Sequence, residues 1–176
     1  MIKNNIKSKK GFTIIEVVLV LAIAGLIFLM VFIAFPALQR GQKDTQRRDD
    51  MARFASQLAQ YQANNYGNVP IDKTNKTKTD KFNKFIDDYL RTNGDTFADP
   101  SGENYTVHTI TVCSGSDDGC PQMSNAEEGD NDTANGYIRV YLNATCSGED
   151  PEYKQGEKYI AFTYKLEGAG IYCGHN

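Results

Sequence analysis

The sequence has little of what an enzyme active site or a metal centre needs. It contains only two histidines, His108 and His175, which stand far apart. It has no nucleophile elbow and no glycine-rich phosphate-binding loop, and neither histidine has a partner that the sequence identifies. These absences predict a protein that is not an enzyme, needs no cofactor and binds no metal.

Cysteine is also scarce, and no two cysteines form the close CxxC pair typical of zinc sites. The four cysteines all lie in the last third of the chain: Cys113, Cys120, Cys146 and Cys173. This pattern indicates two disulfides rather than a metal site or free thiols, and disulfides indicate an oxidising compartment outside the cytoplasm. Among three connectivities we favour Cys113 with Cys120, which closes a short loop, and Cys146 with Cys173, which ties the last strand back.

Positive charge is missing from most of the chain. The formal net charge is −3, and without the four lysines of the first eleven residues the remainder carries −7. An acidic domain offers no general attraction for nucleic acid phosphates, and no basic patch stands out in the C-terminal half. No direct nucleic-acid binding is therefore predicted.

Charge is absent altogether from Val17 to Phe35, a run of 19 apolar or small residues. As a helix, this run is about as long as the hydrocarbon core of a bilayer is thick. A helix that is apolar on every face must be buried all round, in lipid or among identical neighbours. The lysines before it favour a cytoplasmic N-terminus, which places the rest of the chain outside.

A cleavable secretory signal and a plain signal anchor are the simpler interpretations of this run. A cleavable signal has a shorter apolar region that ends at small residues, whereas this run leaves through Phe35 and Pro36. A plain anchor does not explain Glu16, a carboxylate at the entrance of the run. An ionisable group costs free energy in lipid and therefore suggests a function.

The segment KGFTIIEVVLVLAIAGLI, which begins at Lys10, resembles the class III signal of type IV pilins and pseudopilins. The resemblance implies that a membrane peptidase cuts after Gly11, that Phe12 becomes the N-methylated N-terminus, and that Glu16 is the acidic residue used in filament assembly. The new amine of Phe12 would lie four residues from Glu16, about one helical turn. In the low dielectric of a helix bundle, the carboxylate could also pair with the amine of a neighbouring subunit.

The order of the expected elements, helices first and strands after, indicates an α+β fold. In the pilin-like architecture that the resemblance implies, a long N-terminal helix with a transmembrane half and an amphipathic half packs on a small antiparallel sheet. Residues 1–11 would be the leader and residues 12–36 the transmembrane and filament-core helix. Residues 37–176 would form the extracellular globular domain, including the amphipathic half of the helix.

By the same resemblance, the chain is a structural subunit of a type IV pilus filament that serves adhesion, twitching motility or DNA uptake. Its partners would be identical or related subunits, the inner membrane, the prepilin peptidase and the pilus assembly machinery. It would lie in the cytoplasmic membrane as a precursor and outside the cell once assembled. A minor pilin or a secretion-system pseudopilin is the nearest alternative, and a membrane-anchored adhesin or sensor that never polymerises is an alternative of another class.

Features of the long helix beyond the apolar run can also be predicted. Pro36 should bend or loosen the helix, although it could simply mark the membrane exit. Apolar residues at three- and four-residue steps then predict a half-buried helix that ends near Tyr66: Met51, Phe54, Ala55, Leu58 and Tyr61. The charges between Arg40 and Arg53 are interpreted as a solvated face, with a subunit contact as the alternative.

A second helix is predicted over residues 80–92, with an apolar stripe assigned to the core rather than to an interface. Strands are predicted over residues 105–112, 137–142, 158–164 and 171–173. Asp99 to Tyr105 resembles the DPxGxxY turn that enters the sheet in many pseudopilins. Residues 113–136 are expected to form a long loop. Within it, Asp130, Asp132 and Asn135 resemble a calcium loop with the spacing off by one residue, so an ordinary turn is favoured.

Overall fold

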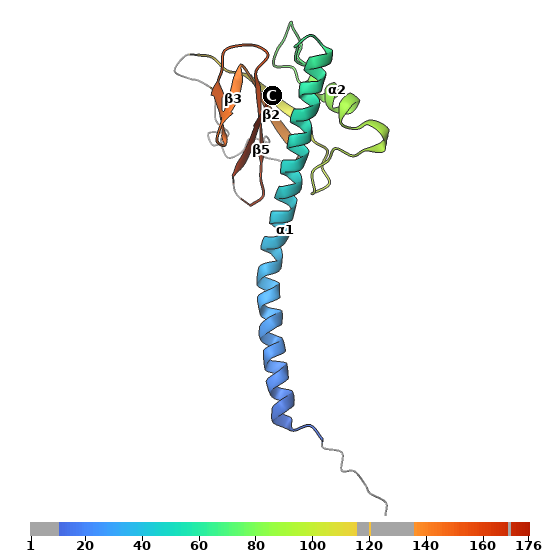
Figure 1. Cartoon of the computed structure of the whole chain (residues 1–176), viewed down its shortest axis with the longest axis vertical. Coiled ribbons are helices and arrows are strands. Elements are labelled where there is room, and N and C mark those ends of the chain that lie inside the picture. Colours follow the sequence, from blue (N-terminus) through green and yellow to red (C-terminus); the bar gives the residue numbers. More distant parts are fainter. Residues whose placement is uncertain (1–10, 116–119, 121–135, 169) are drawn as a thin grey trace, which may run out of the picture. The chain divides into compact units, whose positions relative to one another are not determined.

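The structure, a computed structural model, describes residues 11–115, 120, 136–168 and 170–176 (Figure 1). Its elements are α1 (Ile14–Asn64), α2 (Asp80–Tyr89), the short 3-10 helix η1 (Thr92–Gly94), β1 (Thr106–Val112), β2 (Tyr137–Leu142), β3 (Ala144–Ser147), β4 (Asp150–Tyr153), β5 (Ile160–Lys165) and β6 (Ile171–His175). Helices precede strands, which confirms the predicted α+β class and a pilin-like fold. The chain divides into two compact units, one ending at Gln39 and the other beginning at Arg40.

Helix α1 contains both the apolar run and the amphipathic segment that follows it. It is long and apolar enough in its first part to cross a membrane. The helix is continuous through Pro36 and ends at Asn64, two residues before the predicted end at Tyr66. A bend of its axis at Pro36 stays a prediction.

The second half of α1 supplies the centre of the hydrophobic core. Met51, Phe54 and Leu58 are fully buried, which confirms the predicted amphipathic pattern. The ring of Phe54 lies 4.9 Å from the ring of Phe162 on β5 and 5.8 Å from the ring of Phe85 on α2, measured between centroids. One side chain of α1 therefore packs against both the sheet and the second helix.

Helix α2 is shorter than predicted, but its apolar stripe lies in the core as expected. Phe82, Phe85 and Ile86 are buried, and Leu90 is buried just after the helix ends. The chain then turns through η1, where Gly94 has a φ of 81°, a backbone conformation that glycine adopts without strain. The core interpretation of the stripe is confirmed.

The main sheet has the strand order β1-β2-β5-β6. The β2/β5 and β5/β6 pairs are antiparallel, but β1 and β2 are parallel, whereas the sequence predicted a sheet that is antiparallel throughout. The reason is the length of residues 113–136, because parallel neighbours need a long crossover while a tight hairpin can only give an antiparallel pair.

Opposite Phe162, a side chain on Gly174 would come within 2.4 Å of the phenyl ring, so only glycine fits there.

A second sheet, formed by β3 and β4, was not predicted from the sequence. Both strands have only four residues, and Asp150, Pro151 and Glu152 carry no apolar alternation. The four strands of the main sheet, in contrast, lie within one or two residues of their predicted bounds. Short polar hairpins give too weak a periodic signal to be recognised.

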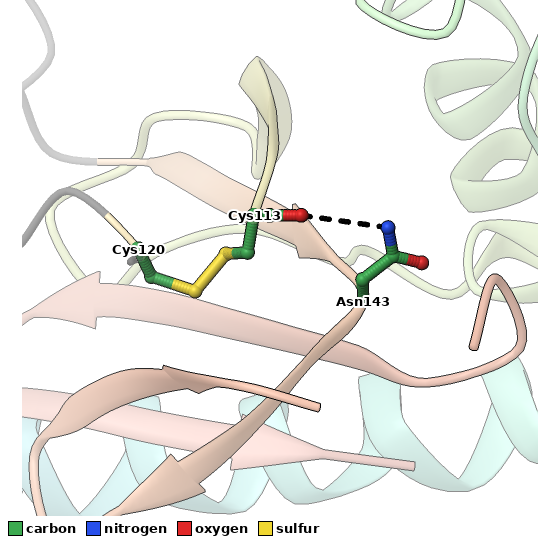
Figure 2. Close-up of a disulfide and its surroundings, with 3 residues drawn as sticks. All are labelled: Cys113, Cys120 and Asn143. Atoms are coloured by element: carbon green, nitrogen blue, oxygen red, sulfur yellow. Dashed lines mark hydrogen bonds between the residues drawn. A yellow bond between two sulfur atoms is a disulfide. The ribbon is translucent and has the colours of Figure 1, made fainter. Parts of the chain in front are cut away.

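The structure contains two disulfides, Cys113–Cys120 and Cys146–Cys173, which are the pairs that the sequence analysis favours. Figure 2 shows the first of them beside Asn143, whose side-chain amide donates a 3.5 Å hydrogen bond to the carbonyl oxygen of Cys113. Asn143 has a φ of 57°, a left-handed conformation that asparagine tolerates better than most residues. The ends of β1 and β2 are thus joined by a side chain next to the disulfide.

Candidate functional site

The first turn of α1 is closed by its own side chains. Thr13 donates two hydrogen bonds to Oε2 of Glu16, from its backbone N–H at 2.9 Å and from its hydroxyl at 2.8 Å. The backbone N–H of Glu16 in turn donates to the hydroxyl of Thr13 at 3.4 Å. This reciprocal arrangement is a capping box, which satisfies backbone donors that a helix N-terminus otherwise leaves unpaired.

The sequence carries this signal, although the role predicted for Glu16 was pairing with the amine of Phe12 and filament assembly, not a cap. A threonine followed three residues later by a glutamate, just before an apolar run, is the pattern of a capping box. Within the described residues, only one carboxylate oxygen of Glu16 is used by the cap. The geometry therefore leaves Oε1 able to accept a further donor.

Gly11 and Phe12 precede the capped turn and are exposed. A Cβ atom added to Gly11 would meet nothing within 4 Å, so the packing of the chain does not itself require glycine there. Phe12 exposes 91% of its surface. Both residues are therefore accessible to other molecules.

The apolar run that follows is exposed on every face of α1. Its large side chains, from Val17 to Phe35, expose between 48% and 77% of their surface. Isolated exposed apolar residues are ordinary, but a surface of this extent marks a contact with lipid or with other proteins. The run is therefore a surface that needs a partner.

A comparison with protein families identifies this region. Residues 6–32 match the model of the prokaryotic N-terminal methylation motif. The chain carries a class III prepilin signal. This confirms the resemblance drawn from the residues around Gly11, Phe12 and Glu16, and it supports a type IV pilin-like or pseudopilin precursor. No curated protein and no solved structure matches the chain.

Downstream of the prepilin signal, a buried ion pair lies within the globular unit. Arg47 of α1 holds Asp99 with two hydrogen bonds, from Nε to Oδ2 at 2.6 Å and from Nη2 to Oδ1 at 3.0 Å. Both residues are almost completely buried. The interpretation of the charges from Arg40 to Arg53 as a solvated face is thus wrong for Arg47, because this side chain faces the turn at Asp99 rather than solvent.

Further groups saturate the carboxylate of Asp99. The hydroxyl of Tyr164 on β5 donates to Oδ2 at 2.6 Å, and Ser101 donates to Oδ1 from its backbone N–H at 2.8 Å. Gly136, at the start of β2, donates its N–H to the oxygen of Tyr164 at 2.9 Å. The segment that resembles a DPxGxxY turn therefore connects α1, the beginning of β2 and β5 through one buried carboxylate.

The ionisation of this cluster follows from its contacts. Burial alone would raise the pKa of Asp99, but the hydrogen bonds from Arg47, Ser101 and Tyr164 outweigh it and hold that pKa well below its usual range. Burial also raises the pKa of Asp50, and here the single hydrogen bond from the hydroxyl of Tyr105 does not offset it. Asp99 is therefore a permanently charged structural group at neutral pH.

Other residues singled out from the sequence stand apart from both clusters. Asp130, Asp132 and Asn135, which resemble a calcium loop, lie outside the described residues, as do the lysines of the leader. The four cysteines lie in the globular unit and tie its strands and loops. The roles of Gly11 and Phe12 in cleavage, and of Glu16 in assembly, stay predictions.

Proposed function

We propose that this chain is a structural subunit of a type IV pilus filament, cut after Gly11 and polymerised through its apolar helix. The observation that carries the proposal is the class III prepilin signal, directly followed by a helix whose apolar run is exposed on every face. Lipid would cover that run in the precursor, and neighbouring helices would cover it in the filament. Filaments of this kind serve adhesion, twitching motility or DNA uptake.

Processing would need partners that handle the exposed N-terminal segment. A prepilin peptidase in the cytoplasmic membrane would cut between Gly11 and Phe12, where the chain leaves open space around the glycine. The pilus assembly machinery would then transfer subunits from the membrane into an extracellular homopolymer. Structural subunits of this family are not enzymes, and we infer no catalytic role for this chain.

The capping box supports a specific part for Glu16 in assembly. Thr13 holds the carboxylate at the first turn through Oε2, so its position is fixed before a second subunit arrives. Cleavage would create a positive amine on Phe12, and Oε1 of Glu16 on a neighbouring subunit could accept it. In a bundle of apolar helices such a pair would set the axial register of the subunits.

The test uses two substitutions of Glu16 that separate its charge from its capping role. Glu16→Ala removes both, whereas Glu16→Gln keeps an oxygen that can serve a capping box. We expect both variants to be processed and to reside in the membrane by immunoblot, but neither to yield filaments in the sheared fraction. Breaking a buried ion pair costs about 3 to 5 kcal/mol per contact, enough to abolish polymerisation. Normal filament numbers in both variants would remove Glu16 from the assembly mechanism, whereas absence of the parent chain from sheared filaments would favour a membrane-anchored adhesin or sensor that does not polymerise.

A minor pilin or a secretion-system pseudopilin is the second candidate. The turn at Asp99, with Pro100 and Gly102 in the spacing of the DPxGxxY segment, favours it. Quantitative mass spectrometry of sheared filaments separates the two roles. A chain that makes up most of the filament mass is a major subunit, and a chain present in trace amounts is a minor one.

A further inference from the structure

A cleft lies in the globular unit beside the end of α1. It has a volume of about 670 Å³, within the range of small-ligand sites. Two segments far apart in the sequence form it, the chain just after α1 and the turn before β5. Its lining includes Gly67, Asn68, Val69, Ile71, Gly156 and Glu157. A shallower hollow of about 350 Å³ shares Gly67 and Lys158 with it.

This cleft is lined by positive charge, although the chain as a whole is acidic. Lys73, Lys76 and Lys158 all line it. Lys76 is neutralised by an ion pair with Glu157 at 2.5 Å, whereas Lys73 and Lys158 form no ion pair within the described residues. Two lysines of the cleft thus have no carboxylate partner among the described residues, and one of them, Lys158, has its ammonium group 5.4 Å from the centre of the Tyr159 ring.

An exposed aromatic residue that directly precedes the cleft lining in the sequence is a second observation. Tyr66 directly precedes the lining residues Gly67 and Asn68, and it exposes 99% of its surface. Its φ of 56° places it in the left-handed region, which is unfavourable for a residue of this kind. This conformation belongs to the end of α1, where the N–H of Gly67 donates to the carbonyl oxygen of Gln62 at 2.8 Å, and it leaves the ring of Tyr66 open to other molecules.

We propose that this cleft binds a saccharide that bears carboxylate groups. Lys73 and Lys158 would pair with the carboxylates, and the exposed ring of Tyr66 offers a flat apolar surface for the C–H face of a sugar ring. The carboxylate of Glu157 can accept hydrogen bonds from sugar hydroxyls. The same carboxylate would repel a phosphate group. The net negative charge of the remaining chain disfavours a long polyanion such as DNA. The proposal goes beyond the filament role and does not depend on it.

The experiment measures binding to the detergent-solubilised full-length chain by calorimetry. The probes are a tetrasaccharide of galacturonic acid, a hyaluronan tetrasaccharide, the neutral sugar maltotetraose and a single-stranded DNA octamer. The variants are Lys73→Ala combined with Lys158→Ala, and Tyr66→Gly. Lys84→Ala, which removes an exposed lysine of α2 outside the cleft, is the matched control.

We expect at least one acidic tetrasaccharide to bind and maltotetraose not to bind. The double lysine variant should weaken binding by at least about tenfold, because hydrogen bonds between charged groups are strong, and Lys84→Ala should leave it unchanged. Tyr66→Gly should weaken binding without lowering the melting temperature, because glycine accepts the positive φ. Absence of binding to both acidic sugars, equal binding of maltotetraose, tighter binding of DNA, or an equal effect of Lys84→Ala would each overturn the proposal.

Discussion

Arg47 is a charged residue whose side chain is buried in the folded chain. Its guanidinium group holds Asp99 in a pair from which water is excluded, so Arg47→Ala leaves a buried carboxylate without its partner. We expect a loss of about 3 to 5 kcal/mol in the free energy of unfolding, measured by urea denaturation. Arg53→Ala is the control, because Arg53 pairs with Asp95 at the surface and its loss should cost less than about 1 kcal/mol. Equal losses in the two variants would contradict the assignment of a buried anchor.

The same cluster predicts how stability depends on pH. The lowered pKa of Asp99 means that its contribution is present above the ordinary pKa of an aspartate, about 3.9, and is lost as the pH falls further. The raised pKa of Asp50 acts in the opposite sense, because burying its charge destabilises the folded chain at neutral pH and protonation relieves that cost. Asp50→Asn should therefore melt at a higher temperature than the parent at pH 7.

This advantage of Asp50→Asn should shrink as the pH falls toward 4, since the parent then becomes neutral at that position too. Thermal melts followed by circular dichroism between pH 4 and pH 7 measure it. Asp49→Asn removes the same charge from an exposed neighbour and serves as the control. A constant difference across the pH range would show that the effect of Asp50→Asn does not come from titration.

At the scale of single residues, the sequence predicted what local patterns determine and missed what distant contacts determine. Glu16 stood out because a carboxylate beside an apolar run is unusual in any fold. Arg47 looked like its solvated neighbours, because a partner 52 positions away at Asp99 leaves no trace in the local pattern. The capping box of Thr13 and Glu16 was readable from its spacing and was overlooked.

Among the structural elements, the two disulfides should differ in their effect on stability. The sequence separation is 27 for Cys146–Cys173 and 7 for Cys113–Cys120. Loop-closure entropy predicts losses of about 3.5 kcal/mol and about 2.4 kcal/mol when each pair is replaced by serine. Urea denaturation of the two double variants measures the difference. Peptide mapping without reduction should recover the same two linked pairs, and free thiols or a Cys113–Cys173 link would refute the pairing.

Most elements of the fold were predictable because their apolar residues repeat with a clear period. The second half of α1, α2 and the strands of the main sheet all carry such a pattern. The parallel pairing of β1 with β2 was not predictable, because strand direction depends on the path of residues 113–136. The hairpin of β3 and β4 was not predicted from the sequence, because its stability comes from packing against the main sheet and from the Cys146–Cys173 bond.

For the molecule as a whole, the central prediction is its processing. Protein isolated from the cell surface should have the mass of the chain from Phe12 onward plus one methyl group, as intact mass spectrometry would show. Gly11→Val should block cleavage while leaving the melting temperature of the globular unit unchanged, because open space surrounds Gly11. Assembled filaments that still contain Met1 would contradict the proposed maturation.

The position of the Arg47–Asp99 pair also has a mechanical consequence. Arg47 is the first buried side chain along α1, before Met51, Phe54 and Leu58. A pulling force transmitted along α1 from its N-terminal end would first load the exposed contacts of Asp44 with the backbone of Glu167 and Gly168, and then this buried pair, before the hydrophobic core. In single-molecule pulling, Arg47→Ala should therefore lower the unfolding force, whereas Arg53→Ala should leave it nearly unchanged. The pair would act as the mechanical clamp between the helix and the strands behind it.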